Sequence, residues 1–491
     1  DQIAMLEGRH LSQKRLIVEE LLAHHLSLQK LRQGMRRHPA LACQPNSILP
    51  AQLLERLPFE LTGAQQKVRE DIEQDLLQSV PMLRLVQGDV GSGKTIVAAL
   101  AALQVIAAGG QVALMAPTEI LAEQHLVNFS QWFEGLATSD GQPIELAWLS
   151  GKSKGKVRQE ALQKIQNADA NIIIGTHALF QDDVIFNRLA LAIIDEQHRF
   201  GVHQRLSLKN KGLISGCVPH QLIMTATPIP RTLAMSAYAD LDTSVIDELP
   251  PGRQKIETFA IPDTRRLEMV NRVSKVCESG SQVYWVCTLI EESDALQCQA
   301  AEDTLGWLQS NLEGLVVGMV HGRMKAKDKS MIMEQFKAGR IDVLVATTVI
   351  EVGVDVPEAT LMIIENPERL GLSQLHQLRG RVGRKADSDS HCLLLYKDPL
   401  TAIAQERIKT MEETNDGFVI AEKDLELRGS GDIYGVRQSG LMDLKIADPI
   451  RDSDLLEFAQ AEAIKIAKTD EKFAKTLVNR WIGTNVDYSE S

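Results

Sequence analysis

Residues 88–95 decide the fold of this chain, and they are Gly88-Asp89-Val90-Gly91-Ser92-Gly93-Lys94-Thr95. An apolar run at 82–87 precedes them and is typical of a buried strand, and an alanine-rich helical run follows at 96–106. Between a strand and a helix, the three glycines let the chain curl tightly enough to turn backbone N–H groups toward phosphate oxygens. The loop therefore predicts a nucleoside triphosphate site, in which Lys94 reaches the terminal phosphates and the Thr95 hydroxyl binds Mg²⁺. A chance match to a short pattern is the alternative, and the flanking strand and helix disfavour it.

A second element completes a hydrolytic site. Residues 191–194 are apolar and predict a buried strand, and Asp195 and Glu196 follow it directly. In a nucleoside triphosphatase, Asp195 would hold the hydrated Mg²⁺, and Glu196 would orient and deprotonate the attacking water. Acidic residues are common at strand ends, so the pair is informative only because it lies downstream of a phosphate loop.

The order of strands and helices divides the chain into two α/β lobes. Apolar strand segments alternate with helical segments over 59–250, and the alternation begins again over 251–410, after a stretch at 247–253 that we interpret as a hinge. Such alternation predicts two tandem parallel sheets wrapped by helices. The predicted strands are 83–86, 111–115, 172–175, 190–194 and 221–225 in the first lobe, and 282–286, 315–320, 342–345, 360–364 and 391–395 in the second.

Residues 1–58 form a linker before the first lobe. Apolar residues recur at helical spacing up to about residue 38, basic residues lie between them, and Pro39, Pro45, Pro50 and Pro58 then interrupt regular structure. We expect a long amphipathic helix that packs against the next domain. Direct contact of its basic residues with DNA is the alternative.

Composition limits the class of protein. The chain has 491 residues, a length typical of about three domains, and 44% of the residues are hydrophobic, which is enough to form their cores. No run approaches the roughly 20 apolar residues of a membrane span, so we expect a soluble protein without a membrane partner. Six cysteines without a CxxC pair are expected to be free thiols of the cytoplasm. The net charge of −12 argues weakly against a nucleic-acid partner, because backbone amides and a few basic residues can hold DNA in a local cleft.

Four motifs in order resemble the superfamily 2 helicases and translocases. They are Gly88 to Thr95, Asp195-Glu196-Gln197-His198, Thr225-Ala226-Thr227 and Gln377-Leu378-Arg379-Gly380-Arg381-Val382-Gly383-Arg384. Further matches lie at 61–65, 116–119, 175–177, 321–323 and 346–355. The resemblance implies two tandem RecA-like lobes with ATP between them. Arg381 and Arg384 of the second lobe would then neutralise the γ-phosphate when the cleft closes; surface ion pairing is the alternative for both arginines.

The resemblance also assigns residues to nucleotide and DNA. The implied nucleotide-binding residues are Phe59, Gln65, Gly88, Gly91, Gly93, Lys94, Thr95, Gly353 and Asp355, with Thr95 and Asp195 on the metal. The implied DNA-contacting or coupling residues are Thr118, Thr176, His198, Thr225, Thr227, Arg428, Arg437 and Gln438. For Thr225 and Thr227, capping of a strand end is the alternative.

The C-terminal part narrows the resemblance to the RecG family. Residues 197–202 and 227–232 are similar to that family and to transcription-repair coupling factors, and 417–440 resembles their shared translocation motif. The helical pattern near the C-terminus, within 446–491, favours the RecG family. Within the translocation segment, 411–445, the repeated glycines predict a short hairpin-like element rather than a continuous helix. A purely structural loop is the alternative.

The resemblance implies an ATP-dependent translocase on double-stranded and branched DNA, acting in fork regression and Holliday junction migration. We expect the motor portion without the N-terminal wedge of such proteins, because the first 58 residues contain no aromatic residue for stacking on bases. A monomer in the bacterial cytoplasm, associated with the nucleoid, is expected, with single-stranded DNA-binding protein as a partner. The rivals are an RNA helicase and a nucleotide-switched DNA-binding protein.

Overall fold

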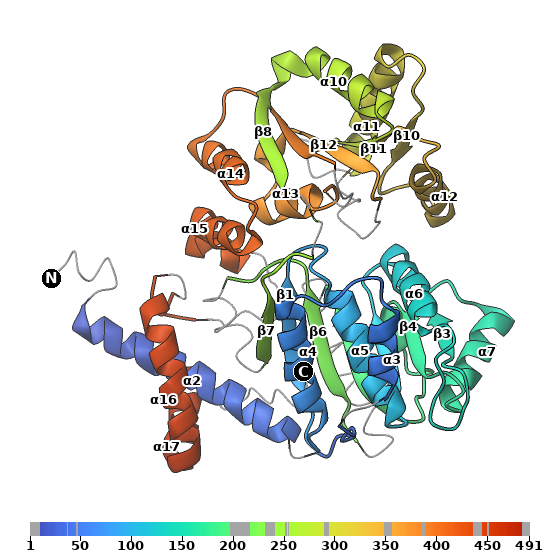
Figure 1. The fold of residues 1–491 in the computed structure, drawn as a ribbon. Helices are drawn as coiled ribbons and strands as arrows, with labels where there is room; N and C mark the ends of the chain where they lie inside the picture. Colours follow the sequence, from blue (N-terminus) through green and yellow to red (C-terminus); the bar gives the residue numbers. More distant parts are fainter. Residues whose placement is uncertain are drawn as a thin grey trace.

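The computed structural model describes residues 10–483, except 37, 46–47, 197–216, 231–240, 251–252, 254, 289–293, 348–355, 384–387, 436–443 and 449–450. Two sheets with flanking helices form two lobes that follow one another along the chain (Figure 1). The predicted α/β architecture of two tandem parallel-sheet lobes is confirmed. None of the helices within these described ranges is long and apolar enough to cross a membrane.

The first lobe contains a seven-stranded sheet in the order β3-β4-β2-β5-β6-β1-β7, and all its paired strands are parallel. The strands are β1 Leu83–Gly88, β2 Gln111–Met115, β3 Leu146–Leu149, β4 Ile172–Gly175, β5 Leu189–Asp195, β6 His220–Thr225 and β7 Asp242–Ile246. The helices are α3 Ile48–Arg56, α4 Gly63–Leu76, α5 Lys94–Ala107, α6 Glu119–Phe133 and α7 Gly155–Gln166. All five predicted strands are present. The sheet edges β3 and β7 were not predicted: the apolar run of β3 is only four residues long, and β7 begins with the polar residues Asp242, Thr243 and Ser244.

The second lobe contains a six-stranded parallel sheet in the order β10-β11-β9-β12-β13-β8. Its strands are β8 Ile256–Pro262, β9 Gln282–Val286, β10 Val317–Val320, β11 Val343–Ala346, β12 Ala359–Glu365 and β13 Ser390–Tyr396. Its helices are α10 Arg266–Glu278, α11 Asp294–Asn311, α12 Ala326–Lys337 and α13 Leu372–Arg379. The five predicted strands are again present, and the edge strand β8 was not predicted.

The buried central strands place the loops that follow them at one edge of each sheet. β1, β5 and β6 are neighbours in the first sheet, so the loops after Gly88, Asp195 and Thr225 lie side by side. In α5, Lys94 and every residue from Ile96 to Ile106 are buried, and the apolar ones among them belong to the main core cluster of the lobe. The phosphate loop therefore joins two rigid, buried elements.

The first described helix, α2 Leu11–Arg36, packs against the last two, α16 Ser453–Thr469 and α17 Glu471–Trp481 (Figure 1). The shared cores are formed by Ile17, Leu21, Leu456 and Ala459, and by Ala23, Leu26, Ala463 and Leu477. The long N-terminal helix was predicted, but its packing partner was not. The apolar face of α2 packs against α16 and α17. An ion pair between Arg32 and Asp242 links α2 to the first lobe.

The translocation segment differs from the prediction. Residues 417–435 form one continuous helix, α15 Gly417–Gly435, and not a hairpin-like element; it follows α14 Ala402–Glu413. The Asp416 carboxylate accepts the Phe418 N–H at 2.8 Å and so caps the first turn. Packing of α15 on α13 outweighs the turn preference of its glycines. Residues 436–443, with Arg437 and Gln438, lie outside the described residues.

Acid is expected to weaken the packing of α2 through His25. This side chain is 2% exposed, and burial, together with the nearby charge of His24, lowers its pKa to about 4. An unfolded chain binds the proton near pH 6.5, so stability from neutral His25 is present above pH 6.5 and is lost as the pH falls toward 4. At pH 5 the loss is about 2 kcal/mol.

Thermal unfolding at pH 7 and pH 5 tests this expectation. His25→Leu cannot take up the proton, so its stability should fall less between the two pH values than that of the unsubstituted chain. His177→Leu, at an exposed histidine, should keep the original difference. An unchanged pH dependence in His25→Leu would contradict the assignment.

Candidate functional site: a nucleotide cleft between the lobes

The phosphate loop has the backbone that its sequence predicts. Gly91 and Gly93 adopt positive φ angles of 78° and 88°, which favour glycine. Gly93 is the N-cap of α5 and supplies no side-chain cap, so the first N–H groups of the helix remain available to an anion. The Lys94 ammonium lies inside the loop and donates to the carbonyl oxygens of Gly88 at 2.7 Å and Asp89 at 2.9 Å. Burial lowers the pKa of Lys94, and the carboxylates of Glu196 and Asp195 oppose that shift.

Side chains from elsewhere crowd the loop glycines. A Cβ on Gly93 would lie 2.2 Å from Nε2 of Gln65, and a Cβ on Gly91 would lie 2.2 Å from Nη1 of Arg253. Gln65 Nε2 donates to the Ser92 carbonyl at 2.8 Å, so Gln65 supports the loop. The predicted contact of Gln65 with adenine stays a prediction.

Phe59, another of the predicted nucleotide-binding residues, is 47% exposed. It lines an open pocket of about 630 Å³ between the end of α3 and the start of α4. Gly63 of this pocket begins α4, the helix that carries Gln65. An exposed aromatic face at a hollow beside the loop suits stacking on a base.

The two acidic residues have different environments. Asp195 ends β5, and its Oδ2 lies 2.7 Å from Nε2 of His125 on α6, a buried residue that the sequence did not single out. Glu196 adopts φ 55°, a left-handed conformation that costs a non-glycine residue about 1–3 kcal/mol. Its N–H donates to the Met224 carbonyl at 2.9 Å, and its Oε1 accepts the Ala226 N–H at 3.2 Å.

The hydrogen bond from the Ala226 N–H to Glu196 connects the predicted general base with the Thr225-Ala226-Thr227 motif. The hydroxyl oxygens of Thr225 and Thr227 lie 2.9 Å apart, which closes the turn that presents the Ala226 N–H. The turn is therefore more than a strand-end cap, because it holds the carboxylate of the preceding motif. Its role in coupling stays a prediction.

The second lobe contacts the phosphate loop through α13. Arg381 follows that helix and is half-buried. Arg379 is 1% exposed and donates to the carbonyl oxygens of Met411 and Thr414, both at 2.9 Å, and to Nδ1 of His376 at 3.0 Å. Arg379 is thus a structural residue within the motif.

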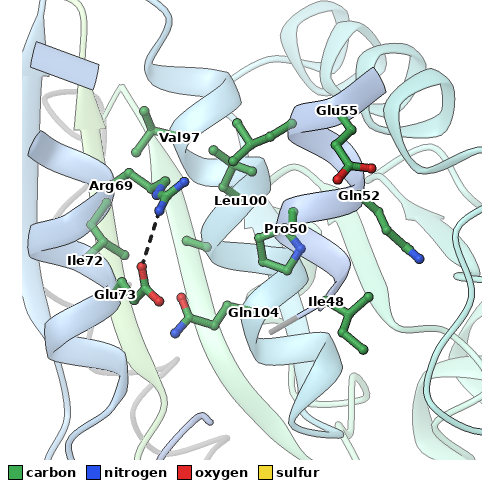
Figure 2. Close-up of a pocket in the computed structure, with 13 residues that line it drawn as sticks. Ile48, Pro50, Gln52, Glu55, Arg69, Ile72, Glu73, Val97, Leu100 and Gln104 are labelled. Atoms are coloured by element: carbon green, nitrogen blue, oxygen red, sulfur yellow. Dashed lines mark ion pairs between the residues drawn. The ribbon is translucent and has the colours of Figure 1, made fainter. Parts of the chain in front are cut away.

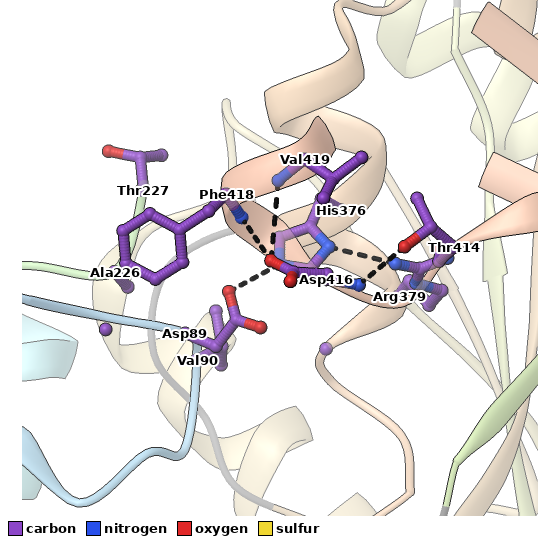
Figure 3. A network of polar contacts seen from close by, with 12 residues as sticks. Asp89, Val90, Ala226, Thr227, His376, Arg379, Thr414, Asp416, Phe418 and Val419 are labelled. Carbon is purple, nitrogen blue, oxygen red and sulfur yellow. Dashed lines mark hydrogen bonds and ion pairs between the residues drawn. The ribbon is translucent and has the colours of Figure 1, made fainter. Parts of the chain in front are cut away.

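Two contacts join the lobes at the phosphate loop. His376 Nε2 lies 2.8 Å from Oδ1 of Asp89 (Figure 3). Arg253, in the segment between the lobes, donates to the Val90 carbonyl and, at 3.4 Å, to the Gly380 carbonyl. The sequence did not indicate that His376 and Arg253 join the lobes. Asp89 lies within the glycine loop and His376 beside Gln377, but no local pattern pairs them.

The predicted DNA-side residues lie at the same sheet edge. Thr118 follows β2 and caps α6 by accepting the Leu121 N–H at 3.4 Å. Thr176 follows β4 and is 3% exposed, and its hydroxyl has no hydrogen-bond partner among the residues that the structure describes. Gly353, Asp355, His198 and Arg384, like Arg437 and Gln438, lie outside those residues; for Arg428 only the backbone, in α15, is described.

The residues present fit a nucleoside triphosphate with Mg²⁺. The loop combines the buried Lys94 ammonium with the uncapped start of α5, and the buried Ser92 Oγ has no hydrogen-bond partner in the described part of the chain. Thr95 and Asp195 offer the oxygen ligands that Mg²⁺ prefers. The described ranges contain no group of three or more His, Cys, Asp or Glu side chains that could hold a metal ion.

A separate pocket of about 330 Å³ lies on the flank of α5, between α3 and α4 (Figure 2). Its lining includes Leu100 and Gln104 of α5, and Arg69 and Glu73 of α4 form an ion pair at 3.7 Å on its wall. None of the predicted nucleotide-binding residues lines it, so this pocket is not the nucleotide site.

Comparison with known proteins shows the family to which the chain belongs. The chain matches three family models in succession: DEAD/DEAH box helicase over 62–236, helicase conserved C-terminal domain over 267–386, and domain 3, C-terminal, of ATP-dependent DNA helicase RecG over 414–481. Similar proteins include ATP-dependent DNA helicase RecG of Escherichia coli O157:H7, 58% identical over 492 residues that cover 100% of this chain and 70% of the relative. RecG of Bacillus subtilis is 45% identical over 467 residues, which cover 94% of this chain and 67% of the relative.

Solved structures extend the comparison. The structure of RecG bound to a three-way DNA junction superposes with a TM-score of 0.71 and 39% identity, covering 91% of this chain and 57% of that chain. The Saccharomyces cerevisiae protein Dbp5, bound to RNA and ADP BeF3, gives a TM-score of 0.55 over 86% of this chain at 17% identity and so shares the fold alone. The chain belongs to the RecG family of ATP-dependent DNA helicases.

Proposed function

We propose that this chain is an ATP-driven motor that translocates on double-stranded DNA and acts on branched DNA. The whole protein would regress stalled replication forks and migrate Holliday junctions in recombination and repair. The observation that supports the proposal is the contact between the lobes at the phosphate loop: His376 of α13, the helix that leads into Arg381, lies 2.8 Å from Asp89 of the loop that carries Lys94. A family member solved on a three-way DNA junction supports the branched substrate.

Bound ATP would supply the phosphoanhydride bond whose hydrolysis drives movement, and Mg²⁺ would neutralise charge on its phosphates. Lys94 and the start of α5 would neutralise further phosphate charge, and Thr95 and Asp195 would hold the metal ion. Glu196 takes a proton from the attacking water, and its bond to the Ala226 N–H fixes the carboxylate for that task.

Hydrolysis is tied to lobe movement in this proposal. Arg381 and Arg384 belong to the second lobe, so they reach the γ-phosphate only when the cleft closes. Gly353 and Asp355 complete the nucleotide contacts from that lobe. Thr225 and Thr227 pass the nucleotide state to the DNA-side loops that carry Thr118, Thr176 and His198.

The ATPase activity of the 491-residue chain tests the proposal. Phosphate release is measured without nucleic acid and with linear duplex, single-stranded DNA, RNA or a model fork. We expect multiple turnovers, with the largest stimulation by duplex-containing DNA. Stimulation by RNA alone would favour an RNA helicase, and a single turnover would favour a nucleotide-switched binding protein; either result would contradict the proposal.

The proposal also includes the state and location of the protein. We infer a monomer in the bacterial cytoplasm, associated with the nucleoid and in contact with single-stranded DNA-binding protein. Known family members of bacteria support the location. Sedimentation of the chain alone and with single-stranded DNA-binding protein would test the monomer and the contact.

A further inference from the structure

The first turn of α15 lies directly against the phosphate loop. A Cβ on Gly417 would lie 2.0 Å from Oδ1 of Asp89 and 2.7 Å from Nε2 of His376. Only a residue without a side chain fits between this helix and the Asp89–His376 pair. The start of the translocation segment is therefore in contact with a residue of the nucleotide-binding loop.

The bond between His376 and Asp89 has a defined direction. An arginine guanidinium can only donate, so Nδ1 of His376 accepts from Arg379 at 3.0 Å and Nε2 carries a proton. Nε2 then donates to Asp89 Oδ1 at 2.8 Å. Burial alone would raise the pKa of Asp89, but the hydrogen bond from His376 and the charges of Lys94 and Arg253 bring it below its ordinary value. Asp89 is ionised at neutral pH. Its negative charge lies against the first turn of α15, and the N-terminus of a helix favours a negative charge.

The helix α15 is clamped to α13, which carries His376. The Asp424 side chain of α15 is 5% exposed, and its two oxygens accept the Leu372 N–H at 3.2 Å and the Ser373 hydroxyl at 2.9 Å. These donors belong to the first turn of α13. Displacement of α13 therefore carries α15 with it.

We propose that Asp89, His376 and Gly417 are positioning residues through which the nucleotide-binding loop sets the position of α15. Lys94 donates to the Asp89 carbonyl, so engagement of Lys94 with phosphate changes the backbone that presents the Asp89 carboxylate. The contact of Asp89 with the first turn of α15 passes that change to the helix. This inference rests on the proposed function of the motor.

Gly417→Ala tests the contact. The added methyl group must displace the Asp89 carboxylate, whereas alanine is otherwise favoured over glycine in a helix. Gly306→Ala in α11 is the matched control, because a Cβ there has nothing within 4 Å. The measurements are duplex-stimulated ATP hydrolysis and displacement of a triplex-forming strand, which reports movement along duplex DNA. We expect Gly417→Ala to keep ATP hydrolysis within about twofold and to lower displacement per ATP at least about tenfold; Gly306→Ala should change neither.

A pair of His376 variants keeps the test informative if Gly417→Ala fails to fold. The amide of His376→Gln can still donate to Asp89 and accept from Arg379, whereas His376→Leu can do neither. Displacement per ATP should fall in His376→Leu and recover in part in His376→Gln. A proportional loss of hydrolysis and displacement, or no difference from the control, would overturn the inference. Failure of the proposed function would appear separately, as an unsubstituted chain without DNA-stimulated hydrolysis.

Discussion

Glu196→Gln is expected to bind ATP as the unsubstituted chain does and to hydrolyse it at least about 100-fold more slowly, the scale of a lost general base. Glutamine retains an oxygen that can accept the Ala226 N–H, so the turn over Thr225 to Thr227 should stay in place. The left-handed backbone at this position is unchanged by the substitution. The variant therefore removes the proton acceptor and leaves its surroundings intact.

Single-turnover and steady-state phosphate release, together with binding of a fluorescent ATP analogue, measure this effect. Glu160→Gln on α7, an exposed carboxylate of the same lobe, is the matched control and should hydrolyse ATP normally. Near-normal turnover in Glu196→Gln would falsify the assignment of the base.

Lys94→Ala is expected to produce a different defect, loss of productive ATP binding. Lys94 is 8% exposed, and its ammonium interacts with the carboxylates of Asp89, Asp195 and Glu196. Its removal leaves these negative charges facing the phosphates. Truncation of one partner of a buried charged pair costs about 2–5 kcal/mol, so the affinity for ATP should fall at least about 30-fold.

Lys94→Met separates charge from packing, because methionine fills much of the same space without a charge. Both variants should bind ATP weakly, and Lys156→Ala, an exposed lysine of α7, should bind it normally. Equilibrium titration with the fluorescent analogue measures the affinity. If Lys94→Met bound ATP as tightly as the unsubstituted chain, the phosphate contact assigned to Lys94 would be wrong.

The predictions from sequence were most accurate for elements with a local sequence pattern and buried residues. All ten predicted strands are present, and nine of them are central strands, which are continuous apolar runs in parallel sheets. The edge strand β8 was missed because the polar residues Glu257 and Thr258 interrupt its apolar run. The helix α15 was missed for a different reason: its glycines favour turns locally, but the Asp416 cap and the buried Asp424 hold the backbone in a helix.

The amino-acid sequence by itself determined the two-lobed α/β class, the phosphate loop and the two acidic residues after β5. These features depend on contiguous residues, whose backbone conformation and hydrophobic period are local properties. Only the tertiary structure decided which side chains support them. His125 reaches Asp195 across 70 positions and His376 reaches Asp89 across 287, and such pairs exist only because sheet order and lobe packing bring distant loops to one cleft.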